Sequence, residues 1–268
     1  MIDKTLLEKR FSANAATYDR YANVQKIMAR QLLERLQTKS IAPQRILEVG
    51  CGTGYLTKRL CRLFPNAQIT AVDLAPGMLE TARARLDGQS VEFVGGDIEE
   101  MELSGSFDLI LSNATFQWFN QLHQTVRRLV ECLSVGGALH FSTFGDTTFH
   151  ELHTSFAKAA EMLEARVSAP GQSFYTLGEL IALCEGAAGC FGRVNGQEWI
   201  EIEKFADTRA FFHSLRKIGA NNSNAADYCQ RPSLFRKMMR IYERDFRDDQ
   251  DLVTATYHCL FISIEKRG

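Results

Sequence analysis

The 268-residue chain is 45% hydrophobic and 24% charged, which is typical of a globular protein and is enough for one large α/β domain. Its formal net charge of −1 provides no overall field that favours nucleic acid or a membrane surface, so we expect neither as a partner. The seven cysteines form no C-x-x-C pair and the opening residues lack an apolar targeting segment, which predicts reduced thiols and a cytoplasmic location.

Helical periodicity covers residues 3–39, with a polar break expected near 12–21. Apolar β-branched runs and helical patterns then alternate along the chain. The predicted strands are 45–49, 68–73, 91–97, 107–112 and 136–144, and the predicted helices are 54–63, 76–86, 121–132 and 149–162. This alternation indicates a parallel sheet with helices on both faces.

The pattern changes in the last part of the chain. Strands are predicted at 195–206 and 254–266, with helices near 207–218 and 232–245 between them. Because these strands lack a parallel crossover, we expect an antiparallel edge hairpin on a seven-stranded, mostly parallel α/β sheet. Residues 1–268 would form a single domain, with a helical cap at 1–40, a core at 41–206 and 251–268, and a helical lid at 207–250.

A glycine-rich turn, E-V-G-C-G-T-G, places Gly50, Gly52 and Gly54 between the first predicted strand and the next helix. Such a turn lets a ligand approach the backbone closely. Its spacing is one residue shorter than the G-x-G-x-x-G of dinucleotide-binding dehydrogenases, and the acid Glu48 precedes it. A carboxylate there suits a cationic ligand, such as an amino acid's ammonium group, better than a pyrophosphate. A turn of this kind can also serve packing alone.

Acidic residues also end the next two predicted strands. Asp73 closes the second strand, where a carboxylate can accept hydrogen bonds from both hydroxyls of a ribose. Asp97 closes the third strand, where it can meet an adenine amino group. Each acid alone is more often a helix cap or a solvated side chain, but with Glu48 they would line one crevice at the carboxyl edge of the sheet.

In this order, the motifs resemble the S-adenosylmethionine-dependent methyltransferases of the Rossmann-like class, over about residues 40–145. The resemblance implies S-adenosylmethionine as the cofactor and S-adenosylhomocysteine as its product. It places Glu48 near the methionine moiety, Asp73 on the ribose and Asn113 below the sulfonium. The other implied cofactor contacts are Gly50, Cys51, Gly52, Thr53 and Gly54 in the turn, Leu74 and Met78 beside the adenine, and Asp97 with Ile98 on the adenine edge.

The stretch N-A-T-F-Q-W, residues 113–118, follows the fourth predicted strand and would face the methyl group. Aromatic faces favour a nearby sulfonium cation and exclude water from the methyl path. We therefore expect Asn113 and Gln117 to orient substrate oxygens, and Phe116 and Trp118 to line the substrate site. The alternative for both aromatic residues is a place in the core under the next helix.

Four segments narrow the resemblance: R-F-S-A-N-A-A-T-Y-D-R-Y-A-N-V-Q, S-N-A-T-F-Q-W-F, S-L-R-K-I-G-A-N-N at 214–222, and A-T-Y-H-C-L-F-I near the end. Together they resemble the malonyl-acyl-carrier-protein O-methyltransferase family of biotin synthesis, through almost the whole chain. That family methylates the free carboxylate of a malonyl thioester, so acyl carrier protein is the implied partner. A carboxylate with a pKa of about 4 is already ionised, so the transfer needs positioning and no general base.

Further roles fall outside the crevice. We expect Tyr18 to close over the methionine end as a catalytic residue, and Arg10 to help bind the cofactor or the substrate carboxylate. His213, Arg216 and Lys217 would bind substrate, with one of the two cations holding the malonyl carboxylate.

The basic helical segment 231–244 is expected to dock the acidic carrier protein. Its apolar residues fall at helical spacing, so that one face can pack while the cations stay exposed. The docking residues would be Arg231, Arg236, Lys237 and Arg240, although a merely solvated amphipathic helix would look the same. His150 and His153 do not complete an H-E-x-x-H motif, and no metal is expected.

Three alternatives share parts of this pattern. A methyltransferase of the same fold acting on a small free acid or a quinone ring would share the motifs in 40–145. Only the 214–222 segment and a preference for carrier-bound substrate would separate it. A non-catalytic S-adenosylmethionine-binding protein is disfavoured by Asn113, Gln117 and the aromatic residues, and a turnover assay would decide. A nicotinamide dehydrogenase is disfavoured by the glycine spacing.

Overall fold

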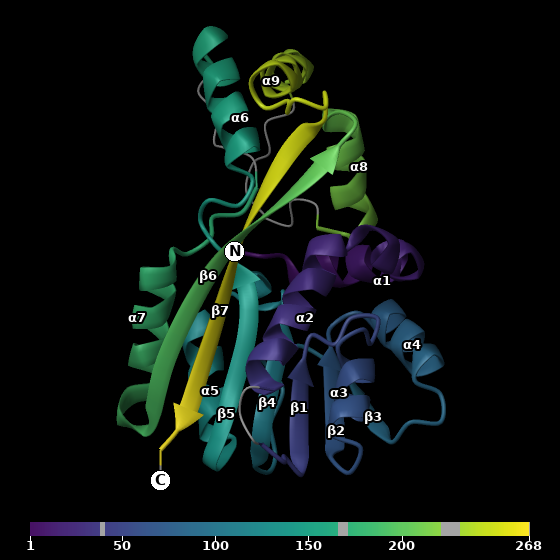
Figure 1. Cartoon of the computed structure of the whole chain (residues 1–268), viewed down its shortest axis with the longest axis vertical. Coiled ribbons are helices and arrows are strands. Elements are labelled where there is room, and N and C mark those ends of the chain that lie inside the picture. Colours follow the sequence, from purple (N-terminus) through teal and green to yellow (C-terminus); the bar gives the residue numbers. More distant parts are fainter. Residues whose placement is uncertain (38–40, 166–170, 221–230, 268) are drawn as a thin grey trace.

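The computed structural model describes residues 1–37, 41–165, 171–220 and 231–267. These residues form a seven-stranded sheet in the order β3-β2-β1-β4-β5-β7-β6, which confirms the predicted α/β fold class (Figure 1). Neighbouring strands from β3 to β5 are parallel, and β7 runs antiparallel to both β5 and β6. The strands are β1 Arg45–Val49, β2 Gln68–Asp73, β3 Val91–Gly95, β4 Phe107–Asn113, β5 Leu133–Phe144, β6 Gly192–Phe205 and β7 Val253–Lys266.

Helices cover both faces of the parallel strands, as the unbroken apolar character of those strands requires. Ile46 and Leu109 belong to the hydrophobic core on one face of the sheet, and Leu47 and Ile110 belong to the core on the opposite face. The helices of the first face are α2 Asn23–Gln37 and α3 Thr57–Leu63, and those of the second are α5 Leu122–Glu131 and α7 Leu177–Ala188. Helix α4 Pro76–Arg85 follows β2.

The β6–β7 hairpin extends beyond the parallel strands and carries an upper layer of helices (Figure 1). This layer consists of α6 His150–Met162, α8 Thr208–Lys217 and α9 Pro232–Asp245. Tyr242 anchors α9 there, because its ring is fully buried and its hydroxyl donates to the carbonyl of Thr254 over 2.7 Å. The N-terminal helix α1 Lys4–Tyr21 lies between this upper layer and the carboxyl ends of the parallel strands.

The predicted break at 12–21 is wrong. Helix α1 is continuous to Tyr21, and the chain turns at the buried Ala22, whose N–H still donates to the carbonyl of Tyr18. The side chain of Asp3 caps the other end of α1 by accepting from the N–H of Leu6. Polar residues of this segment have hydrogen-bond partners within the helix and outside it: Asn14 donates to the carbonyl of Arg10, and Asp19 accepts from Thr53.

Helix α7 was not predicted. Its first turn is closed by a capping box, in which Thr176 and Glu179 bond each other's backbone N–H groups. Gly178 and Gly186 weaken the helical pattern in the sequence, and the helix packs against β6 and α5. The helix predicted from 54 begins at Thr57, because Gly54 still belongs to the turn.

Among the residues described, no helix combines the length and apolar character needed to cross a membrane. The six cysteines within the described ranges are all free thiols, and Cys229 lies outside those ranges.

Candidate active site

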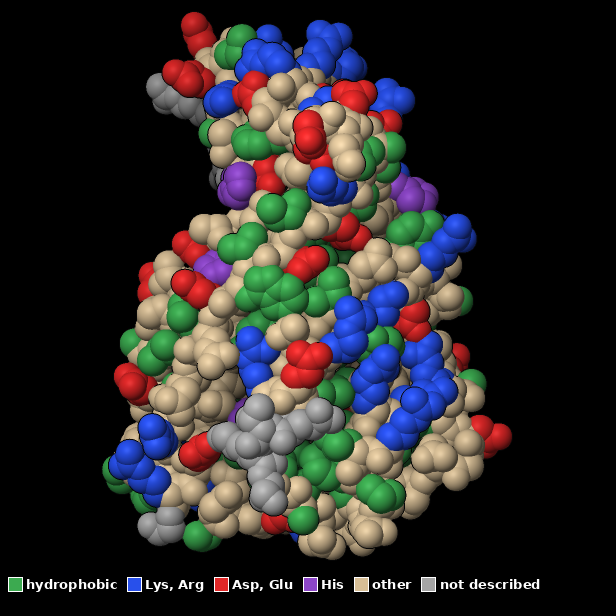
Figure 2. Space-filling view, viewed as in Figure 1, with side chains coloured by type: hydrophobic (Ala, Val, Ile, Leu, Met, Phe, Trp, Pro, Cys, Tyr) green, Lys and Arg blue, Asp and Glu red, His purple; other side chains and the backbone are tan. Residues whose placement is uncertain are grey.

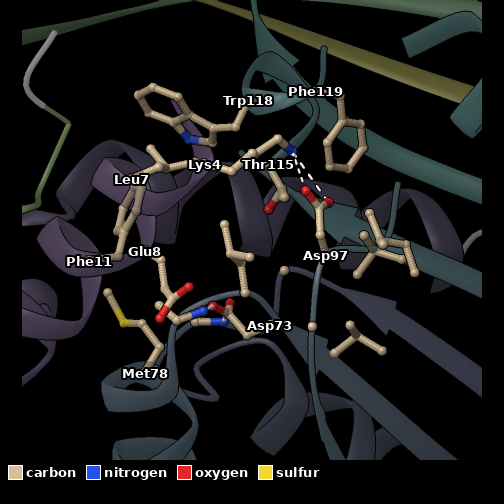
Figure 3. A pocket seen from close by; sticks show the side chains of 18 of the residues that line it. Lys4, Leu7, Glu8, Phe11, Asp73, Met78, Asp97, Thr115, Trp118 and Phe119 are labelled. Atoms are coloured by element: carbon tan, nitrogen blue, oxygen red, sulfur yellow. Dashed lines mark hydrogen bonds and ion pairs between the residues drawn. The ribbon is translucent and has the colours of Figure 1, made fainter. Parts of the chain in front are cut away.

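A pocket lies at the carboxyl ends of β1 to β4, with α1 forming one wall (Figure 3). The register of the sheet places these ends level, because Val49 pairs with both Val72 and Ser112, and Asp73 pairs with Gly95. The described residues that line the pocket are Lys4, Leu7, Glu8, Phe11, Tyr18, Val49, Gly50, Gly52, Val72, Asp73, Leu74, Ala75, Met78, Gly96, Asp97, Ile98, Asn113, Ala114, Thr115, Trp118 and Phe119.

The glycine turn forms the floor beside β1. Gly50 has a φ of +72°, and a Cβ added there would lie 2.1 Å from the hydroxyl of Thr115, so no side chain fits. Gly52 also has a positive φ, +53°, but no protein atom lies within 4 Å of its Cβ direction, which leaves open space at the pocket wall. Three residues of the turn, Cys51, Thr53 and Gly54, do not line the pocket, and their contact with a cofactor stays a prediction. Thr53 instead donates to Asp19 over 2.7 Å.

Asp73 reaches the pocket from the end of β2, as predicted. Its carboxylate accepts hydrogen bonds from the N–H of Gly52 at 2.7 Å and from that of Ala75 at 2.9 Å. Burial raises the pKa of Asp73 to about 6, although these two bonds act in the opposite direction. The group is therefore a fixed acceptor, ionised at neutral pH, beside open space.

Glu48 is not on the pocket wall. Its side chain is 1% exposed, is absent from the pocket lining, and leaves Oε2 without a hydrogen-bond partner. Desolvation raises the pKa of Glu48 to about 8, with the neighbouring Thr57 opposing the shift. Side chains alternate along a strand, so Val49 and Glu48 point to opposite faces of β1, and only Val49 lines the pocket.

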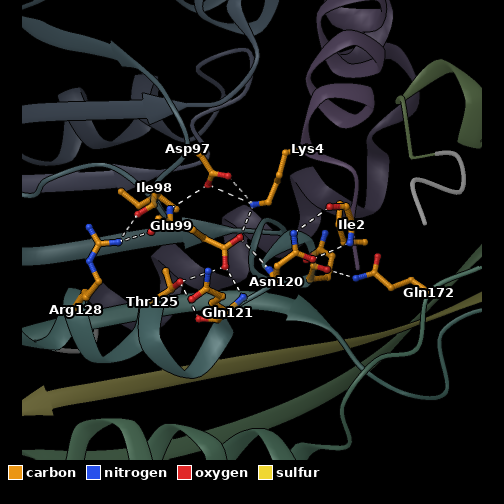
Figure 4. A network of polar contacts seen from close by, with 11 residues as sticks. Ile2, Lys4, Asp97, Ile98, Glu99, Asn120, Gln121, Thr125, Arg128 and Gln172 are labelled. Carbon is orange, nitrogen blue, oxygen red and sulfur yellow. Dashed lines mark hydrogen bonds and ion pairs between the residues drawn. The ribbon is translucent and has the colours of Figure 1, made fainter. Parts of the chain in front are cut away.

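Lys4 joins two acids beside the part of the pocket that Asp97 lines, a connection that no sequence motif indicates (Figure 4). Its Nζ lies 3.1 Å from Oδ2 of Asp97 and 2.5 Å from Oε2 of Glu99. Glu99 in turn accepts from the N–H groups of Asn120 at 2.9 Å and Gln121 at 2.5 Å. The start of α1 is thereby fixed across the end of β3 and the loop before α5.

The backbone beside Lys4 makes a second connection. The N–H of Ile2 donates to Oδ1 of Asn120 over 2.7 Å, and Nδ2 of Asn120 donates back to the carbonyl of Ile2 over 3.0 Å. This pair and the Lys4 contacts form one network, shown in Figure 4.

The stretch 113–118 divides between the pocket and the interior. Asn113 and Trp118 line the pocket, as expected. Phe116 does not: it is 1% exposed and stacks on Phe141 with ring centroids 3.9 Å apart, so the alternative core assignment is correct for this residue. Gln117 also points elsewhere, donating to the carbonyl of Ala114 over 2.7 Å and accepting from Thr143 over 3.0 Å.

The different orientations of the Phe116, Gln117 and Trp118 side chains have a local cause. Residues Phe116–Trp118 form a 3₁₀ turn, in which successive side chains point about a third of a turn apart. Asn113, by contrast, is held at the strand end, since it accepts from Ser142 at 2.8 Å and donates to the carbonyl of Gln25 at 3.0 Å.

Three aromatic side chains meet at one end of the pocket. The ring of Phe11 lies 5.7 Å from that of Trp118, edge to face at 79°, and 6.2 Å from that of Tyr18. Burial, together with the charges of Asp73 and Asp19, raises the pKa of Tyr18 well above its usual value, so its hydroxyl stays protonated. Phe11 was not predicted. Residues 4, 7, 8, 11 and 18 share a face of α1, and this helical spacing is the signal that marks them.

The end of α8 contacts the middle of α1. A Cβ on Gly219 would lie 3.2 Å from the backbone of Arg10, and the ring of His213 lies 5.7 Å from that of Tyr21. Arg10, His213, Arg216 and Lys217 are absent from the described pocket lining, and their binding of substrate or cofactor stays a prediction. Asn221 and Asn222 of the 214–222 motif lie outside the described residues.

Helix α9 has the boundaries predicted for it and the expected division of faces. Leu234, Met238, Ile241 and Tyr242 are buried. The basic residues are Arg231, Arg236 and Arg240, which are exposed, and Lys237, which is half-buried. Figure 2 shows Lys and Arg side chains gathered over the upper end of the molecule, where α9 lies. No cluster of three potential metal ligands occurs among the described residues.

Comparisons with known proteins agree with this architecture. A family model described as a methyltransferase domain matches residues 46–137. The YcgJ protein of Bacillus subtilis superimposes with a TM-score of 0.61, at 16% identity, over 88% of this chain and 98% of that one. The N-methyltransferase NodS of Bradyrhizobium japonicum, solved with S-adenosylhomocysteine, gives 0.56 at 16% identity over 98% and 99% of the two chains. These two similarities establish the fold.

Sequence relatives are much closer. The malonyl-acyl-carrier-protein O-methyltransferase of Bacillus anthracis is 50% identical over 271 residues, covering 100% of this chain and 99% of the relative. The protein of the same name from Priestia megaterium is 48% identical over 272 residues, covering 99% of each. The chain therefore belongs to the malonyl-acyl-carrier-protein O-methyltransferase family, as its sequence motifs predict.

Proposed function

We propose that the chain transfers a methyl group from S-adenosylmethionine to the free carboxylate of a malonyl thioester on acyl carrier protein, as the first step toward the pimeloyl chain of biotin. The extent of the similarity carries this proposal. The methyltransferase domain model matches only residues 46–137, whereas relatives named for this reaction match at 48–50% identity over the whole chain. The outer helices, where a carrier-bound substrate would be recognised, are therefore included in the similarity.

The pocket residues fit S-adenosylmethionine. Asp73 offers a buried carboxylate to the ribose hydroxyls, and Gly52 leaves the adjoining space open. Met78 and Ile98, which are 2% and 4% exposed, and Leu74 provide apolar surfaces for an adenine, with Asp97 at its edge. When bound, the cofactor supplies an electrophilic methyl group on a positively charged sulfur.

The chain's own residues would position the reactants and exclude water. Phe11, Tyr18 and Trp118 close one end of the pocket with aromatic surface, which also favours a cation. The hydrogen bonds that fix Asn113 keep its amide in place beside them. A malonyl carboxylate is ionised at neutral pH and is itself the nucleophile, so we propose that no general base and no metal take part. Orientation can lower the barrier by roughly 7–11 kcal/mol.

We further propose that the cap, residues 1–40, and the lid, residues 207–250, handle the substrate. Arg216 or Lys217 would hold the malonyl carboxylate, since the end of α8 lies against α1. The exposed cations of α9 would attract the acidic carrier and set its orientation. Helix α1 would then contact both the cofactor site in the core and the outer helices that recognise the substrate.

The test is to incubate the purified protein with malonyl-carrier protein and S-adenosylmethionine and to analyse the carrier by intact mass. We expect the mass to rise by one methyl group, and the added group to be released by an esterase as methanol. Methylation of free malonate or a quinone at a higher catalytic efficiency would instead support the alternative methyltransferases. Cofactor binding without turnover on any of these substrates would contradict the proposal.

A further inference from the structure

One carboxylate joins the end of α1 to two other elements that form the pocket. Oδ1 of Asp19 accepts a hydrogen bond from the hydroxyl of Thr53 over 2.7 Å, and Oδ2 forms an ion pair with the guanidinium of Arg85. Nη1 of Arg85 also donates to the hydroxyl of Thr53, over 3.1 Å. Because Thr53 belongs to the glycine turn and Arg85 ends α4, the three side chains connect α1, the turn and α4.

These contacts lie directly behind the pocket wall. Tyr18, which precedes Asp19, lines the pocket, and so does Gly52, which precedes Thr53. Neither Asp19 nor Thr53 belongs to the described lining. The main chain of Asp19 is held as well, because Lys26 of α2 donates from Nζ to its carbonyl over 2.7 Å. The position of Tyr18 relative to the glycine turn is therefore fixed from outside the cavity.

Tyr18 needs such support because no hydrogen bond of its own fixes its side chain. Within the described part of the chain its hydroxyl has no hydrogen-bond partner, and its ring contacts that of Phe11. Burial, followed by the charges of Asp73 and Asp19, raises the pKa of this hydroxyl, which therefore remains a donor at neutral pH. The main chain at the end of α1 determines where this donor points.

We propose that Asp19 is a positioning residue for methyl transfer: by binding Thr53 and Arg85, it fixes the hydroxyl of Tyr18 relative to the glycine turn. This inference rests on the proposed function. A contact that only stabilised the fold would change the amount of folded protein and not the rate of each folded molecule. A positioning contact changes that rate, because a displacement of about 1 Å can slow a reaction roughly 100-fold.

The first measurement is the steady-state rate of Asp19→Asn, which keeps the shape of the side chain and removes its charge. We expect kcat to fall about three- to tenfold and KM for malonyl-carrier protein to stay within about twofold, since Asp19 does not contact the carrier-bound substrate. Arg85→Met removes the same ion pair from its other end. It should reproduce the change in kcat.

A double-mutant cycle tests whether the effect passes through Tyr18. In the Tyr18→Phe background, Asp19→Asn should lower kcat by less than about twofold, because the hydroxyl that it positions is already absent. Hydrogen exchange of the ligand-free protein gives a second readout that needs no turnover. In Asp19→Asn the amides at the end of α1 should exchange about threefold faster, and those near Lys4 should keep the wild-type rate.

Asp87→Asn is the matched control. Asp87 is an exposed acid in the turn after α4, two residues from Arg85 and outside the described pocket lining. Its removal takes away one charge close to the same arginine, and we expect wild-type values of kcat and of exchange. Thermal unfolding of each variant separates a change in rate from a loss of folded protein.

Three results would overturn the inference. The first is a wild-type kcat in Asp19→Asn or in Tyr18→Phe. The second is a loss of kcat that adds fully to that of Tyr18→Phe, which would place the action of Asp19 elsewhere. The third is unchanged exchange at the end of α1 in Asp19→Asn, which removes this inference whatever the substrate is. A wild-type protein that does not methylate malonyl-carrier protein would instead remove the proposed function.

Discussion

The Nζ atom of Lys4 lies 2.5 Å from Oε2 of Glu99 and connects the N-terminal helix to the far side of the pocket. Glu99 is 5% exposed and also accepts the N–H groups of two loop residues, Asn120 and Gln121. The contact therefore holds α1, which carries Glu8, Phe11 and Tyr18, in place as a wall of the site.

Removing this contact should loosen α1. In Lys4→Met, we expect the amides of α1 to exchange with solvent about five times faster, because a partly buried ion pair contributes on the order of 1 kcal/mol. Hydrogen-exchange mass spectrometry of the ligand-free protein measures this directly. Lys9→Met is the control, since Lys9 is an exposed lysine on the same helix outside the pocket. Equal exchange in the two variants would show that the Lys4–Glu99 contact does not hold the helix.

Gly52→Val should abolish cofactor binding while leaving the protein folded. The valine side chain would enter the open space that the ligand needs, and the positive φ of +53° would add a strain of about 1–2 kcal/mol. Gly88→Val is a matched control, because Gly88 has a φ of +77°, equally open surroundings and a place outside the pocket. Calorimetry should show a loss of cofactor affinity in Gly52→Val and not in Gly88→Val. Thermal unfolding should show the same stability for both variants. Normal affinity in Gly52→Val would remove the glycine turn from the site.

Because of Glu48, the free energy of unfolding should fall as the pH rises, which is opposite to the usual effect of a carboxylate. Burial raises its pKa from 4.5 to about 8, so the folded state binds a proton that the unfolded state releases. The stabilising contribution is complete below pH 4.5 and is lost as the pH rises toward 8. Glu48→Gln does not titrate, so its stability relative to wild type should rise by about 1.4 kcal/mol per pH unit in this window. Denaturant unfolding at several pH values measures the difference, with Glu80→Gln as a control that should show no such slope.

The basic face of α9 predicts a selective effect on the carrier. Arg236→Glu combined with Arg240→Glu should raise the Michaelis constant for malonyl-carrier protein and leave any turnover of malonyl-coenzyme A nearly unchanged. The effect should shrink with added salt, because exposed charges are screened over about 10 Å at 0.1 M.

Helix α3 provides the comparison for this prediction. Lys58→Glu with Arg62→Glu reverses an exposed basic pair of the same spacing on another face of the molecule. We expect this α3 double variant to have the wild-type Michaelis constant for malonyl-carrier protein. If the α3 pair impairs the carrier reaction and the α9 pair does not, the docking surface lies over α3.

The parts of the site that the sequence predicts are those fixed by the sheet. Asp73 and Asn113 end parallel strands and Asp97 follows β3 closely, and parallel strands in register bring their carboxyl ends together whatever the connecting helices do. The change of pattern in the last part of the chain also predicts the antiparallel β6–β7 edge, which the pairing of β7 with both β5 and β6 confirms.

The parts that the sequence does not predict depend on tertiary contacts. Lys4 and Glu8 are ordinary charged residues of a helix until α1 is placed against the strand ends. The side-chain types of Phe116 and Gln117 predict a place in the site, but a single 3₁₀ turn directs Gln117 to Thr143 and Phe116 to Phe141. Local pattern cannot determine which of two neighbouring aromatic residues, Phe116 or Trp118, faces the cavity.

The most direct test of the proposed function is the rate of methyl ester formation on malonyl-carrier protein, malonyl-coenzyme A and free malonate, each with the same labelled cofactor. We expect the highest kcat/KM for the carrier-bound substrate, with the label recovered as a methyl ester of the malonyl carboxylate. Free malonate methylated as efficiently as malonyl-carrier protein, or a label recovered on any other atom of the carrier, would contradict it.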